Sequence, residues 1–136
     1  MSTINVGTIK SITSNVPPMF QDSGGTSVGN LTRASIRFNQ TGTQAINQAF
    51  NVSSIADTGT GQTQINFTNN IRNEAGTQTA AYSVSLASNG SAVSTHHLGF
   101  FVIGTPSTSN VSVVFFNIDN SGLRADCNMA FVSIHC

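Results

Sequence analysis

Residues 31–39 read LTRASIRFN, and apolar and polar side chains alternate strictly through most of this stretch. Successive residues of a β-strand point to opposite faces, so such an alternation gathers the apolar side chains on one face. The apolar face would carry Ala34, Ile36 and Phe38, and the polar face Arg33, Ser35 and Arg37. The stretch therefore predicts a strand that covers a core with one face and meets solvent with the other.

Further strand patterns follow along the chain. They are expected at residues 45–55, where Phe50 and Val52 would share a face, and at 63–69, 80–87, 98–104, 111–119 and 128–135. Polar segments separate them, including a turn at 56–62 and an Asn89-Gly90 step that favours a tight hairpin. About eight short strands divided by turns predict an all-β fold, an antiparallel β-sandwich that is jelly-roll-like.

Two of these segments, LGFFVIG at 98–104 and VSVVFFNID at 111–119, are almost continuously apolar. An apolar run of this length is typical of a strand that is buried on both faces. An antiparallel sheet usually keeps one face in water, so a second apolar face needs a second cover. Either the sheet is sandwiched within the domain, or a neighbouring subunit supplies that cover, and the second option predicts an oligomer.

The first thirty residues differ from the rest of the chain. They contain the Pro17-Pro18 pair, which cannot donate to a strand ladder, and room for one short strand around residues 4–9. We therefore expect an extended N-terminal arm or attachment segment over residues 1–30 and a β-sandwich domain over residues 31–136.

The composition is poor in charge: 7% of residues are charged and the formal net charge is zero. Uncharged polar residues are abundant instead, with 18 Ser, 16 Thr and 15 Asn, and these residue types suit turns and strands. Nucleic-acid backbones are bound by clustered Lys and Arg, which this chain lacks. We expect neither nucleic-acid binding nor membrane insertion, and we find no secretory signal.

No residue pattern indicates an enzyme. The acidic residues number five, the turn positions of Asp57, Asp119 and Asp126 suit backbone capping, and no nucleophile elbow occurs. We expect no catalytic residues and no cofactor. His96 and His97 are adjacent and would point to opposite faces of a strand, so one chain offers no metal site; a metal on a three-fold axis, with one His from each subunit, stays an alternative.

Two cysteines, Cys127 and Cys136, bracket the last expected strand. Their odd spacing would place them on opposite faces of that strand, and a bridge between them would require the strand to bend. We therefore expect free thiols.

Residues 33–71 resemble a segment of virion surface proteins from marine tailed bacteriophages. In that pattern an Asn-ending strand, a Gly-Thr turn, Phe-Asn-Val-Ser-Ser-Ile, a Gly-Thr-Gly turn and an Asn-Phe-Thr strand follow one another. The matching residues are Phe38, Asn39, Gly42, Thr43, Phe50, Asn51, Val52, Ser53, Ser54, Ile55, Gly59, Thr60, Gly61, Asn66, Phe67 and Thr68. Residues 9–11, 16–18, 22–23 and 28–29 are similar to the lead-in of the same proteins. The pattern usually has Trp where Ser35 stands, and this chain has no Trp.

The resemblance implies a structural protein on the surface of a phage particle, assembled in the host cytoplasm. It implies a tail-fibre or adhesin-type module that acts by multivalent binding, with capsid decoration as the alternative. The resemblance also implies partners: further copies of the chain in a homotrimer, other virion proteins of the tail or capsid, and a host surface receptor. Polar loops near 56–62, 69–79, 88–97 and 104–110 would form the contact surface, because loops carry recognition on β scaffolds. A glycan-cleaving depolymerase is the least favoured alternative.

Overall fold

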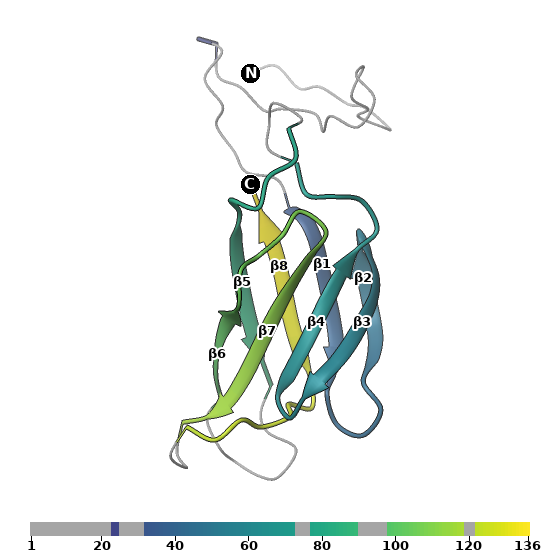
Figure 1. Ribbon diagram of the computed structural model, residues 1–136, viewed down its shortest axis with the longest axis vertical. Coiled ribbons are helices and arrows are strands. Elements are labelled where there is room, and N and C mark those ends of the chain that lie inside the picture. Colours follow the sequence, from purple (N-terminus) through teal and green to yellow (C-terminus); the bar gives the residue numbers. More distant parts are fainter. Residues whose placement is uncertain (1–22, 25–31, 73–76, 90–97, 119–121) are drawn as a thin grey trace, which may run out of the picture.

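The computed structural model describes residues 23–24, 32–72, 77–89, 98–118 and 122–136. Two four-stranded sheets pack face to face (Figure 1). The first sheet contains, in spatial order, β2 (Ala45–Phe50), β1 (Thr32–Asn39), β8 (Ala130–His135) and β5 (Ser83–Ser88). The second sheet contains β3 (Val52–Gly59), β4 (Gln62–Phe67), β7 (Asn110–Asn117) and β6 (Leu98–Ile103). All neighbouring strands are antiparallel, so the predicted β-sandwich is confirmed.

The chain alternates between hairpins within a sheet and crossings between sheets. Hairpins join β1 to β2, β3 to β4, and β6 to β7. The chain crosses between the sheets after β2, β4, β5 and β7. The first strand, β1, pairs with the last strand, β8. The expected arm over residues 1–30 lies outside the described residues except for an exposed turn at Ser23 and Gly24.

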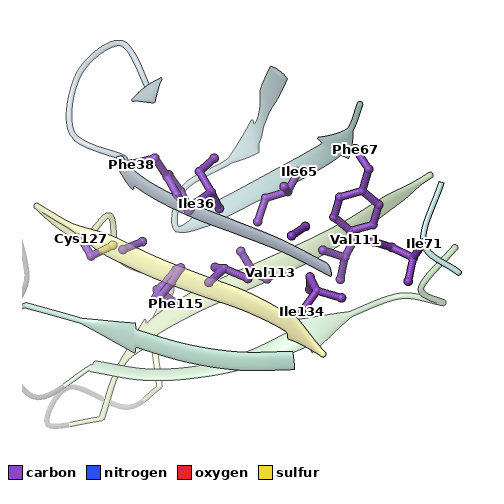
Figure 2. Close-up of a cluster of buried hydrophobic side chains, with 13 residues drawn as sticks. Ile36, Phe38, Ile65, Phe67, Ile71, Val111, Val113, Phe115, Cys127 and Ile134 are labelled. Carbon is purple, nitrogen blue, oxygen red and sulfur yellow. The ribbon is translucent and has the colours of Figure 1, made fainter. Parts of the chain in front are cut away.

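The core lies between the two sheets and is built by the inward faces that the alternation predicts (Figure 2). It consists of Ala34, Ile36, Phe38, Ile65, Phe67, Ile71, Val111, Val113, Phe115, Cys127, Ala130, Val132 and Ile134. Tyr82, Val84 and Leu86 share a face and pack against this cluster, as the sequence predicts. Full burial of one such aliphatic or aromatic side chain stabilises the fold by roughly 1.5–3 kcal/mol.

The predicted single strand at residues 45–55 is wrong, because the chain leaves one sheet and enters the other at Asn51. Asn51 has a φ of 54°, and it separates β2 of the first sheet from β3 of the second. Phe50 is consequently 59% exposed, whereas Val52 packs against the core, so the two side chains do not share a face. The predicted turn at 56–62 is also too long: β3 continues to Gly59, and the turn occupies Thr60 and Gly61.

Of the two apolar segments, β7 matches the expectation and β6 does not. The core side of β7 is fully buried, and Val114, which faces the opposite way, is only 1% exposed. By contrast, β6 lies at the edge of its sheet, with Phe100 40% and Phe101 51% exposed. An apolar run indicates that a strand can be buried, but its position in the sheet decides whether anything covers it.

The predicted hairpin at Asn89-Gly90 is also wrong. Gly90 lies outside the described residues, but the strands on either side, β5 and β6, belong to different sheets. β5 pairs with β8 instead, and β6 pairs with β7. A hairpin dipeptide favours a local turn, and here the pairing of the flanking strands with more distant partners overrides it.

Candidate recognition surfaces

The loops that the sequence predicts as one contact surface lie at two opposite ends of the sandwich (Figure 1). Residues 68–72 and 104–109 meet at one end, where the amide of Ile71 donates to the carbonyl of Thr108 at 2.8 Å. The Thr60-Gly61 turn and Asn89 lie at the other end, with residues 122–129. A ligand at one end would therefore not contact the loops at the other. Residues 73–76 and 90–97 of the predicted surface are outside the described residues.

At the first end, Tyr82 fastens the loop between β6 and β7. Its hydroxyl lies 3.0 Å from the carbonyl oxygen of Ser107 and 3.2 Å from that of Asn110, and its single O–H is shared between the two acceptors. Burial raises the pKa of Tyr82 to about 12, because the phenolate is less well solvated there than in water. The Ser107 hydroxyl in turn accepts from the amides of Ser109 and Asn110. This loop is thus held by its own hydrogen bonds.

At the opposite end, Gly61 is enclosed by neighbouring backbone. Its amide donates to Oδ1 of Asp126 at 2.7 Å, and its carbonyl accepts from the amide of Phe115 at 2.8 Å. Its φ is +67°, and a Cβ added there would lie 2.4 Å from the carbonyl oxygen of Phe115. Only glycine combines this conformation with this close approach.

A buried polar cluster lies beside that turn. Gln40, only 1% exposed, donates through Nε2 to the hydroxyl of Thr63 at 3.0 Å, and Thr63 donates to Oε1 of Gln44 at 2.7 Å. Oε1 of Gln40 accepts from both the amide and the thiol of Cys127 at 3.1 Å. Within the described part of the chain, no buried side-chain nitrogen or oxygen lacks a partner. The cluster is internally satisfied, so it has a structural role and offers nothing to a ligand.

Both cysteines are free, as the sequence predicts. Burial raises the pKa of the Cys127 thiol to about 12. The thiol donates its proton in a hydrogen bond to Oε1 of Gln40. The Cys136 thiol is half-buried and donates to the carbonyl of Arg72 at 2.9 Å.

The described residues contain no group of three or more His, Cys, Asp or Glu side chains that would hold a metal. His96 and His97, the residues of the axial-metal alternative, lie outside the described residues, as do Asp22, Glu74 and Asp119. His135 is half-buried on β8, with Nδ1 3.5 Å from the hydroxyl of Thr32. Within the same described ranges, no helix has the length and apolar character to cross a bilayer.

A shallow depression of about 200 Å³ lies on the outer face of the first sheet. Side chains from β1, β2 and β8 line it: Ser35, Arg37, Gln48, Phe131 and Ser133. The core-facing Ile36 and Val132 contribute to its floor. Sequence reasoning missed this surface. Its residues come from three separate stretches, and only the pairing of β1 with β2 and β8 brings them together.

Comparisons with protein-family models, with curated proteins and with solved structures found no match for the chain.

Proposed function

We propose that this protein is a bacteriophage virion component displayed on the particle surface, a fibre or adhesin-type module that acts by multivalent binding and not by catalysis. The proposal rests first on the resemblance of residues 33–71 to virion surface proteins of marine tailed phages. Weak individual sites suffice for such a module, because many copies on one particle raise the avidity by orders of magnitude.

One structural observation carries the proposal: large apolar side chains stay exposed along strands at both edges of the sandwich. β2 is exposed along its whole length, with Phe50 59% exposed, and on β6 Phe101 is 51% exposed. A chain with 7% charged residues has few charges to keep such edges apart in solution. Contact with further copies, in a homotrimer, or with other virion proteins would cover these strands.

Capsid decoration is the second candidate, and the placement of the exposed strands favours it. β2 and β6 lie at opposite sides of the sandwich, since β2 neighbours β3 and β6 neighbours β5 across the core. A subunit with an apolar edge on each side suits a shell in which every copy touches two neighbours. This role needs no receptor.

Immunogold labelling of phage particles whose genome encodes the chain tests both candidates. Label at the tail tip supports the adhesin, and label over the head supports decoration. Binding of the purified chain to host cells would support the adhesin. Heads that burst more readily without the chain would support capsid decoration. Particles that carry no label would refute the virion proposal, and steady turnover of a host polysaccharide by the pure chain would refute the non-enzymatic part.

A further inference from the structure

The outer face of the first sheet carries two parallel rows of side chains, each running across four strands. The first row is Phe50, Ser35, Ser133 and Ser85, and the second row is Gln48, Arg37, Phe131 and Ala87. The depression lies among Ser35, Arg37, Gln48, Phe131 and Ser133, so Phe131 is the aromatic ring that lines it. Phe50 and Phe131 are 59% and 41% exposed. Two strand spacings, roughly 10 Å, separate the strands that bear them.

The polar groups of this face differ from those on the outer face of the second sheet. There, Asn66 donates to the hydroxyl of Ser54 at 3.1 Å and accepts from Nε2 of Gln64 at 2.8 Å, so the side chains satisfy one another. On the first sheet, no hydrogen bond joins the side chains of Arg37 and Gln48 to any described residue. Both side chains are exposed, so their donors are accessible to a ligand.

The charged side chain in these two rows is positive. Arg37 is exposed in the middle of the second row. The acidic side chains with described positions lie elsewhere: Asp57 is on β3 of the other sheet, and Asp126 accepts from the Gly61 amide at the end of the sandwich. A guanidinium with no acidic neighbour suits a carboxylate, which it binds through two parallel hydrogen bonds.

We propose that this face binds a short acidic saccharide, one whose rings carry carboxylate groups. Phe131 would stack against the apolar face of a sugar ring, Arg37 would pair with a carboxylate, and Gln48, Ser35 and Ser133 would bond to hydroxyls. The depression is smaller than the ~300–1,000 Å³ of pockets that enclose a drug-sized ligand, which suits an open contact with part of a chain. This inference rests on the proposed binding function and names its ligand class.

Isothermal titration of the purified full chain with oligogalacturonate, and with neutral malto-oligosaccharide as comparator, tests the inference. We expect the acidic probe to bind and the neutral probe to bind at least about tenfold more weakly. Phe131→Ala should weaken binding of the acidic probe about tenfold, the size of a lost aromatic anchor. Arg37→Met should weaken binding of the acidic probe by a similar factor and remove most of its advantage over the neutral one.

Two matched variants control for unspecific effects. Arg124→Met removes another exposed cation outside this face, and Leu123→Ala removes an exposed apolar side chain outside the edge strands; both should leave binding unchanged. Equal binding of both probes, no binding, or equal losses in the control variants would overturn the inference. So would a Phe131→Ala variant that changes only the oligomeric state. Particle labelling is independent of this titration, so failure of the saccharide site and failure of the virion proposal are distinguishable.

Discussion

At the residue scale, a few side chains hold the loops of the sandwich in place, and each makes a separate measurement possible. Tyr82 is the only tyrosine of the chain, and the chain has no tryptophan. The ultraviolet absorbance of its phenolate therefore reports on one site. Gly61 and Gly42 share nearly the same φ, +67° and +68°, but only Gly61 is enclosed by neighbouring backbone.

We expect Tyr82 to titrate with a pKa of about 12 in the folded protein and about 10 in denaturant, because burial disfavours the phenolate. A pKa that is raised in the folded state contributes stability that is fully present below pH 10 and lost as the pH rises through about 12. The pKa of Cys127, which burial raises from 9.0 to about 12, changes the stability with pH in the same direction. Spectrophotometric titration with and without urea measures this, and a pKa near 10 in the folded protein would contradict it.

Gly61→Ala should destabilise the protein by roughly 2–5 kcal/mol, because the new methyl group meets the Phe115 carbonyl and the backbone is left-handed. Gly42→Ala is the matched control. It imposes the same backbone cost of roughly 1–2 kcal/mol, and no atom lies within 4 Å of the added Cβ. Urea unfolding midpoints compare the two variants. Equal losses would show that the contact with Phe115 is unimportant.

At the scale of the elements, the crossing from β2 to β3 depends on one residue. Nδ2 of Asn51 donates to the carbonyls of Arg33 at 2.9 Å and Asn69 at 3.1 Å, and Oδ1 accepts from the Asn69 amide at 2.8 Å. These bonds tie the crossing to the start of β1 and to the segment after β4. Asparagine also tolerates the left-handed conformation better than most residues.

Asn51→Ala should cost about 2 kcal/mol, since it loses these bonds and gains backbone strain. Asn51→Gly loses the same bonds but relieves the strain, so its loss should be smaller. The difference between the two unfolding free energies isolates the backbone term. A larger loss for glycine than for alanine would contradict this account.

At the scale of the whole molecule, the sandwich has a closed core and open edges. The described large side chains that stay exposed are Ile46, Phe50, Phe100, Phe101, Ile118, Leu123 and Phe131. Ile46 and Phe101 belong to the edge strands β2 and β6, whereas Leu123 lies in the segment between β7 and β8. An uncharged, apolar edge strand is the usual site of association between copies.

We expect the purified chain to sediment as an oligomer, with Ile46→Lys and Phe101→Lys shifting it towards monomer. A lysine at a sheet edge disfavours pairing with another chain. Leu123→Lys is the matched control, because it adds the same charge at a site 60% exposed and outside the edge strands. Analytical ultracentrifugation over a range of concentrations makes the comparison. A wild-type chain that stays monomeric throughout would contradict the expectation.

Period-two alternation was enough to predict the strands, the inward faces and the sandwich class, because side-chain direction along a strand is a local property. Ala34, Ile36 and Phe38 lie in the core for this reason. Which strands pair, and which lie at an edge, depends on contacts between distant segments, so the alternation could not reveal the crossing at Asn51 or the exposure of Phe101. The alternation could not reveal the depression around Arg37 and Phe131 for the same reason, because only strand pairing brings residues 37, 48 and 131 side by side.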